Sequence, residues 1–232
     1  MDFSKIKVIK SKGNSGAVIN LTDNILVPNT IIWPTLEIVQ KLYQSNHLKD
    51  FNEEYHGILT KELGYYCDLY SIKSEDSITW SLFGYISKLE YSIKNNFYNE
   101  FLKNIKVKED KIISIELWKR IPHPETKVSG GPEIDVILNG EKYCILIEVK
   151  WTSGIDKKQG KNKNKTQIEL RNMFCNGIGK KIFKTKKCIT VVVANENTEN
   201  ELFLSWDKLS DFETLPHKKL FKEYLKWKKS YI

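Results

Sequence analysis

The chain of 232 residues is 41% hydrophobic and 28% charged, and it carries a formal net charge of +8. This length and apolar content are enough to bury the core of one domain, or of one domain with an extension. No apolar run has transmembrane length and the N-terminus has no secretory h-region, so we expect no membrane partner. The four cysteines lack metal-ligand spacing, and we expect reduced thiols in a cytoplasmic protein.

Residues 1–73 have weak structural signals, and we interpret them as an N-terminal extension to a domain that spans residues 74–232. This domain is predicted to begin with one long helix that ends near residue 103, because apolar residues recur every three or four positions. Ser74 suits the N-cap, and Glu75 suits the positive end of the helix dipole. At about 100° per residue, Glu75 lies near the middle of the apolar stripe and Glu90 near its edge. A core-facing acid needs a partner, so Glu75 is either a functional acid or only a complement to the dipole.

Three strand-like segments follow, of which the first spans residues 112–121 and the other two form a predicted hairpin. Asn139-Gly140 is a two-residue turn signal between two apolar runs. Because side chains alternate along a strand, Glu148 and Lys150 share one face, and Asp135 can face them from the partner strand. Two carboxylates beside one ammonium form a hard-oxygen site for a divalent cation.

The remaining predicted elements are a helix over residues 163–178, a strand over 188–194 and a tail helix over 217–229. The first of these helices should stop near Gly177, and it places Gln167 and Arg171 on one face. The strand, CITVVVA, is apolar enough to be buried on both sides. In the tail helix we expect three apolar side chains to dock while six lysines face out.

The positive charge is concentrated in one segment. Between Lys150 and Lys187 there are twelve lysines and arginines and two acids, a net charge of +10, whereas the whole chain carries +8. This field would draw a polyanion to the segment that begins at Lys150. The candidate nucleic-acid-binding residues there are Lys157, Lys158, Lys161, Lys163, Lys165 and Arg171.

The pattern of Pro132, Asp135 and Glu148-Val149-Lys150 resembles the PD-(D/E)xK nuclease superfamily. Its motif is a Pro-Asp or similar dipeptide, a spacer, and Asp/Glu-x-Lys at the end of a hydrophobic strand. Here Glu133 and Ile134 follow the proline, so either Glu133 or Asp135 could be the ligand, and we favour Asp135. The resemblance implies an α/β fold with a restriction-endonuclease-like core: α-β-β-β-α-β, a mixed central sheet flanked by helices.

The same resemblance implies the roles of the site residues. Asp135, Glu148 and the backbone carbonyl of Val149 would bind Mg²⁺, with Mn²⁺ as a substitute, and Glu75 would be a further ligand. Lys150 would orient the attacking water or neutralise charge on the phosphoryl oxygens. Gln167 would hold a ligand or that water, and Arg171 would reach a phosphate oxygen, although both could instead belong to a solvated helix face.

The expected function is therefore that of a metal-dependent nuclease, DNA being favoured over RNA and an endonuclease of restriction, defence or repair type over other kinds. A homodimer or a partner protein is left open. The alternative is a non-catalytic nucleic-acid-binding module, or a subunit of a larger nuclease complex that keeps the fold. A binder needs basic groups but gains nothing from two clustered acids facing phosphate, which favours the nuclease.

Overall fold

The computed structural model describes residues 1–10, 16–44, 68–121, 132–152, 158, 160, 162–183, 186–196 and 202–232. These residues group into two compact units. One comprises Met1–Lys88 with Lys219–Ile232, and the other comprises Leu89–Lys218. This grouping divides the chain after Lys88 and not after residue 73, and it joins the C-terminal helix to the N-terminal segment.

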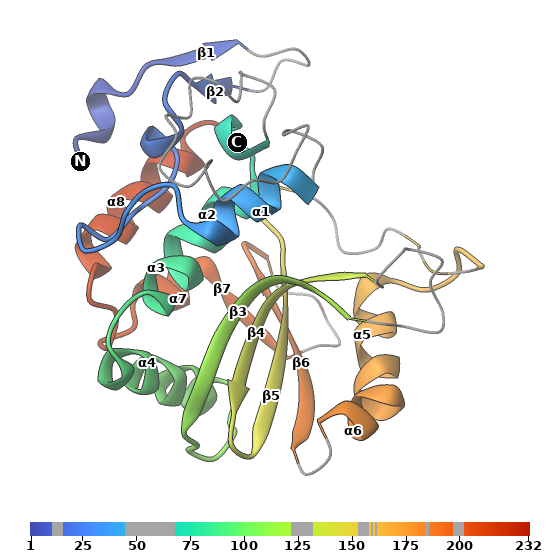
Figure 1. The fold of residues 1–232 in the computed structure, drawn as a ribbon. Helices are drawn as coiled ribbons and strands as arrows, with labels where there is room; N and C mark the ends of the chain where they lie inside the picture. Colours follow the sequence, from blue (N-terminus) through green and yellow to red (C-terminus); the bar gives the residue numbers. More distant parts are fainter. Residues whose placement is uncertain are drawn as a thin grey trace. The chain divides into compact units, whose positions relative to one another are not determined.

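The second unit is built on a mixed sheet, so the α/β class expected from the sequence is confirmed. Among the described residues the sheet has five strands in the order β3-β4-β5-β6-β7. The first three strands pair antiparallel, and β6 and β7 continue parallel to β5 (Figure 1). The strands are β3 (Ile112–Arg120), β4 (Glu133–Gly140), β5 (Tyr143–Val149), β6 (Lys187–Ala194) and β7 (Phe203–Ser205).

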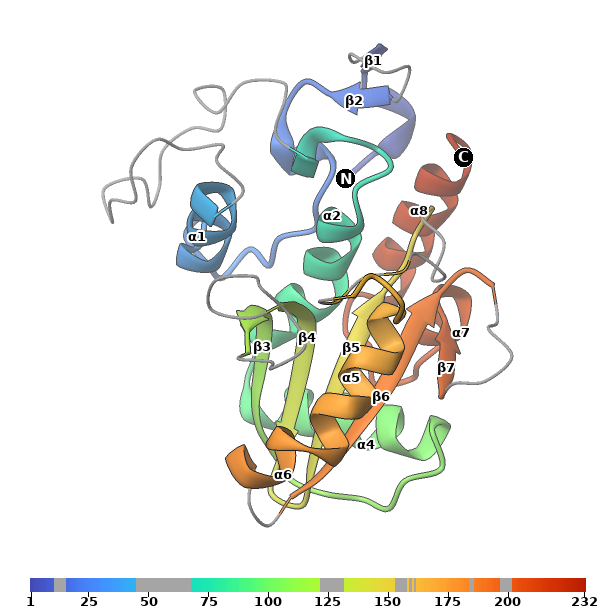
Figure 2. The ribbon, with the colours of Figure 1, turned by 90° about the vertical axis from the view of Figure 1, so that its right-hand side faces the viewer.

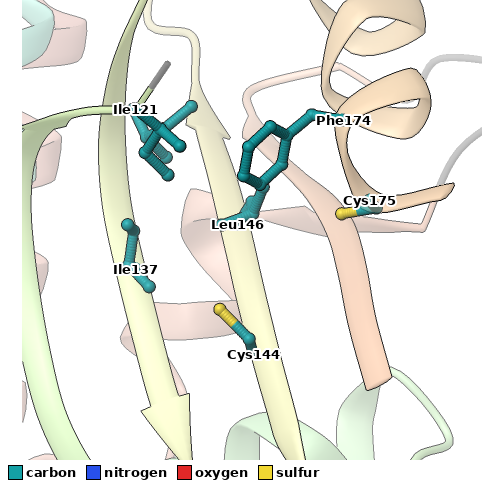
Figure 3. Close-up of a cluster of buried hydrophobic side chains, with 7 residues drawn as sticks. Ile121, Ile137, Cys144, Leu146, Phe174 and Cys175 are labelled. Atoms are coloured by element: carbon teal, nitrogen blue, oxygen red, sulfur yellow. The ribbon is translucent and has the colours of Figure 1, made fainter. Parts of the chain in front are cut away.

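Helices cover both faces of this sheet. Figures 1 and 2 show α4 (Tyr91–Asn104) on one face and α5 (Gln167–Asn176) with α6 (Ile178–Ile182) on the other. Phe174 of α5 points toward Leu146 of β5 in a buried apolar cluster (Figure 3). Burial of an aromatic side chain of this size contributes about 1.5–3 kcal/mol. This packing fixes α5 over the central strands, and the short helix α7 (Trp206–Ser210) follows β7.

The long helix predicted from residue 74 to about 103 is wrong, because the chain breaks near Glu90. The first part runs through α2 (Glu75–Thr79), a π-helical stretch (Trp80–Gly84) and α3 (Tyr85–Ser87). Glu90 is extended, with φ −60° and ψ 155°, and its carbonyl accepts the Lys94 amide that opens α4. The spacing of apolar residues shows which face of a helix is buried. Two consecutive amphipathic helices can keep the same spacing, so the spacing did not reveal the break between them.

The turn of the hairpin lies two residues beyond the predicted Asn139-Gly140. Asn139 pairs with Cys144 across the ladder, so both predicted turn residues belong to β4 and the chain reverses at Glu141 and Lys142. The side chain of Asp110 stabilises this reversal by accepting the amides of Lys142 and Tyr143, at 2.9 and 3.1 Å. A tertiary contact, and not the turn signal, therefore sets the position of the turn.

The end of α5 and the start of β6 are joined by a disulfide between Cys175 and Cys188. The expectation that all four cysteines are reduced is wrong for this pair, because the packing of α5 on the sheet brings two positions 13 residues apart together. Cys144 is a free, buried thiol, and burial raises its pKa to about 12. It is a core residue, as expected for a cysteine within an apolar strand.

The first unit contains short elements and one longer helix, α8 (Lys218–Lys229). Its other elements are β1 (Val8–Lys10), β2 (Gly16–Val18), α1 (Leu36–Gln44), α2, α3, and 3-10 turns at Phe3–Lys5, Leu21–Asp23 and Asp68–Tyr70. The prediction of a basic tail helix is confirmed, but Leu220 is only half-buried and Lys228 is completely buried. Lys228 donates to Ser77 Oγ at 2.7 Å, so not all six lysines face solvent.

Candidate active site

Asp135 and Glu148 lie where strands β4 and β5 separate. The last pair of the ladder is Val136 with Ile147, and one further step in the same register leads to Asp135 and Glu148. Beyond that point the Val149 amide donates to Asp135 Oδ2 at 2.7 Å. The amide and carbonyl of one strand residue point to the same side, so the Val149 carbonyl also faces this fork. This register agrees with the one assumed from the sequence, and the pairing of the two acids as ligands stays a prediction.

Glu148 is 1% exposed, and each of its carboxylate oxygens lies near a buried cation. Lys150 Nζ lies 3.0 Å from Oε1, and Arg171 Nη2 lies 3.4 Å from Oε2. Two carboxylates are thus accompanied by two cations. The balance matters because an unpaired charge in this environment would be strongly destabilising.

Arg171 is 3% exposed and so does not lie on a solvated helix face. Its Nη2 donates to the Glu133 carbonyl at 2.7 Å, which anchors the guanidinium at the start of β4. Thr166 caps α5 in a capping box with Glu169, and Arg171 follows one turn later, on the side that meets the sheet. Arg171 was predicted as a phosphate contact, and the structure brings it to the metal-ligand candidate Glu148.

The backbone of Lys150 is held by two hydrogen bonds from distant parts of the chain. Its amide donates to the Val193 carbonyl at 2.8 Å, and its carbonyl accepts the indole N–H of Trp206 at 2.9 Å. Trp206 is completely buried and meets the Trp151 ring edge-on, with 6.3 Å between ring centroids. Asn195 in turn donates to the Trp151 carbonyl at 2.7 Å. The sequence analysis identified neither Asn195 nor Trp206 as a site residue, since neither belongs to the motif.

Gln167 and Glu90, two other predicted site residues of this unit, make no side-chain hydrogen bond or ion pair with the cluster within the described residues. Gln167 is half-buried at the first position of α5, and it makes no hydrogen bond or ion pair with another described residue. Glu90 is exposed at the N-cap of α4. Glu75 opens α2 in the other compact unit, and its role as a ligand stays a prediction.

The lysines predicted to bind nucleic acid are only partly described. Lys157 and Lys161 lie outside the described residues. Lys158 lies 3.7 Å from the Glu169 carboxylate with about half of its side chain exposed. Lys163 is exposed and Lys165 is half-buried.

Glu148 Oε2 is the site oxygen whose surroundings bear on the predicted metal ligation. It is buried, and it has no hydrogen-bond partner among the described residues, because its contact with Arg171 is long. Buried carboxylate oxygens normally have such partners. Nowhere in the described parts of the chain do three or more His, Cys, Asp or Glu side chains gather as a metal site, so a metal here would have two carboxylates and main-chain oxygen. Hard cations accept that donor set together with water.

Comparisons with protein-family models, curated proteins and solved structures gave no match. The family resemblance therefore depends on the motif and on the order of the elements. No helix within the described residues is long and apolar enough to cross a membrane.

Proposed function

We propose that the protein is a metal-dependent nuclease of the PD-(D/E)xK type, acting on DNA as an endonuclease. The observation that supports this best is that Asp135 and Glu148 both lie at the β4-β5 fork, with the side chain of Lys150 at 3.0 Å from the Glu148 carboxylate. The helix, three strands, helix and strand that contain the motif follow one another in the order of the restriction-endonuclease-like core.

In this proposal Asp135, Glu148 and the Val149 carbonyl hold one Mg²⁺ or Mn²⁺ at the fork. The bound ion would supply Lewis acidity and lower the pKa of a coordinated water. Lys150 places a positive charge beside the phosphoryl oxygens, where negative charge grows in the transition state. Its main-chain hydrogen bonds to Val193 and Trp206 limit how far that charge can move. Gln167, at the first position of α5, would orient the attacking water.

The first test is cleavage of circular and linear DNA by the purified protein with Mg²⁺ or Mn²⁺. Asp135→Asn and Glu148→Gln should each lower the cleavage rate by about 10³-fold or more, because each removes a charged metal ligand. Both variants conserve side-chain volume, and circular dichroism checks their fold. Glu90→Gln, which alters an exposed acid of the same unit, should cleave at the normal rate.

The outcomes separate the candidate functions. Cleavage of the circular substrate identifies an endonuclease. Full activity in Asp135→Asn or Glu148→Gln refutes the assignment of that residue to the active site. The concentration of +10 net charge between Lys150 and Lys187 also suits a binding module. Nucleic-acid binding without cleavage, with either metal, would favour that module over the nuclease.

A further inference from the structure

The contacts of Arg171 place a fixed cation on an oxygen that a metal would need. Its Nη2 is shared between the Glu133 carbonyl at 2.7 Å and Glu148 Oε2 at 3.4 Å. Its Nε is buried and has no hydrogen-bond partner among the described residues. Nη2 is thus held firmly by Glu133 and weakly by Glu148, while Nε has no hydrogen-bond partner among the described residues.

This arrangement leaves the hydrogen-bonding capacity of a buried arginine incompletely satisfied. Guanidinium and carboxylate groups form short, paired hydrogen bonds when the geometry is free to optimise. Here the side chains are 4% and 1% exposed, so the solvent provides little substitute for those bonds. An incoming group could gain from both residues, because a divalent cation would satisfy Glu148 and an anion would satisfy the released guanidinium.

We propose that Arg171 occupies Glu148 when no metal is bound and is transferred to a phosphate oxygen of the nucleic acid when a divalent cation replaces it. The inference rests on the proposed function, since it needs a metal on Glu148. Its consequence is that metal and nucleic acid bind cooperatively. By thermodynamic linkage, each should increase the affinity for the other by the same factor.

Charge arithmetic supports the exchange. Without ligands, Asp135 and Glu148 are balanced by Lys150 and Arg171. A divalent cation alone would leave the four groups with an excess of two positive charges, which a phosphate of the nucleic acid partly neutralises. The two ligands together are therefore less costly to desolvate than either alone.

The first measurement is Ca²⁺ binding by calorimetry in the absence of nucleic acid, since Ca²⁺ takes oxygen ligands. Arg171→Gln should bind Ca²⁺ about tenfold more tightly than the unaltered protein, because the competing cation is gone. Arg171→Met serves as a second variant if one of the two folds poorly. Equal or weaker Ca²⁺ binding by well-folded Arg171 variants would overturn the inference.

Lys186→Met is the matched control for net charge. Lys186 Nζ binds Asn139 Oδ1 at 2.7 Å, and Asn139 lies on the same face of β4 as Asp135 but away from Glu148. Replacing Lys186 lowers the positive charge on that face by one, but it removes no cation from the Glu148 carboxylate. A change in Ca²⁺ affinity as large as that of Arg171→Gln would reveal a general field effect and contradict direct competition.

The second measurement repeats the titration with a short DNA duplex present, while a gel checks that the duplex stays intact. The duplex should tighten Ca²⁺ binding about tenfold in the unaltered protein and in Lys186→Met, and by less than about threefold in Arg171→Gln. Unchanged coupling in Arg171→Gln would refute the transfer to phosphate.

The failure of the inference differs from the failure of the proposed function. If Glu148→Gln binds Ca²⁺ as well as the unaltered protein, Glu148 is no metal ligand and the function itself is refuted. If Glu148→Gln loses Ca²⁺ while Arg171→Gln behaves normally, the metal site stands and only the exchange is refuted.

Discussion

The contacts of Glu148 change the expected effect of its substitution on the stability of the protein. From the sequence alone, Asp135 and Glu148 are two neighbouring negative charges, and removal of either one would be expected to relieve their repulsion. In the structure, the Glu148 carboxylate lies between the buried cations of Lys150 and Arg171. Truncation to alanine would leave both cations without that partner, and breaking a buried pair in this way costs about 3–5 kcal/mol. The isosteric glutamine keeps the volume and one acceptor oxygen and is the milder variant, but it also removes the charge, so its free energy of unfolding is measured beside its cleavage rate.

Trp206 is predicted to act on catalysis through the position of Lys150. Trp206→Phe keeps an aromatic ring but removes the N–H that donates to the Lys150 carbonyl at 2.9 Å. Small displacements of a catalytic group lower rates steeply, so we expect kcat to fall about tenfold with KM nearly unchanged. Single-turnover cleavage and duplex binding measure the two effects.

Trp227→Phe is the control for that experiment. The Trp227 indole N–H is buried without a hydrogen-bond partner in the described part of the chain. Its replacement should leave kcat unaltered. Equal loss of kcat in both variants would mean that Trp206 serves the general stability of the protein and not the placement of Lys150.

The β4-β5 hairpin shows how an element depends on a neighbour for its geometry. Asp110 Oδ2 accepts the Lys142 and Tyr143 amides and also the Tyr98 hydroxyl, at 3.3 Å. Gly140 lies directly against these groups. The glycine is needed for close approach, since a Cβ at this position would overlap both the Asp110 carboxylate and the Tyr98 hydroxyl.

Gly140→Ala should accordingly destabilise the protein by about 1–3 kcal/mol, through overpacking around Asp110. Urea unfolding measures this loss. Glu141→Ala changes the next residue, which is exposed in the turn, and its effect should stay within about 0.5 kcal/mol. If the two variants were equally stable, Gly140 would have room for a side chain and the contact would not set the hairpin.

The first unit joins segments from both ends of the chain through Lys228. This lysine is completely buried and lies over the Tyr224 ring, and it donates to Ser77 Oγ at 2.7 Å and to Asn24 Oδ1 at 3.3 Å. Asn24 also donates to the Leu69 carbonyl, at 2.6 Å. Burial lowers the pKa of Lys228 well below its usual value, because the charged form is poorly solvated there.

This shift predicts a pH dependence of stability. The unfolded chain binds a proton at Lys228 up to about pH 10.4, whereas the folded protein releases it at lower pH, so stability rises with pH between the two pKa values. The free energy of unfolding should therefore increase from about pH 7.5 to about pH 9.5, relative to Lys228→Met. Burial raises the pKa of Tyr224, and its ionisation in the unfolded chain would oppose the trend at still higher pH.

Urea unfolding at both pH values checks this expectation. Lys226→Met, at an exposed position of the same helix, should retain the pH dependence of the unaltered protein. A slope that persists in Lys228→Met would assign the effect to another group.

The sequence by itself determined the features that depend on neighbours along the chain. Alternation along an apolar strand is enough to put Glu148 and Lys150 on one face, and the order of apolar runs is enough to indicate an α/β sheet. The start of α2 at Ser74 and the end of α5 at Gly177 follow from cap residues. These signals are local, so no knowledge of the rest of the fold was needed.

Only the tertiary structure decided which partners meet across long distances in sequence. The burial of Arg171 against Glu148, the bond from Trp206 to Lys150, and the burial of Lys228 each join residues from separate elements. The position of the turn after Gly140 depends in the same way on a contact with Asp110. The physical reason is that hydrogen bonds and ion pairs are satisfied in space, while periodicity and capping are properties of a single segment.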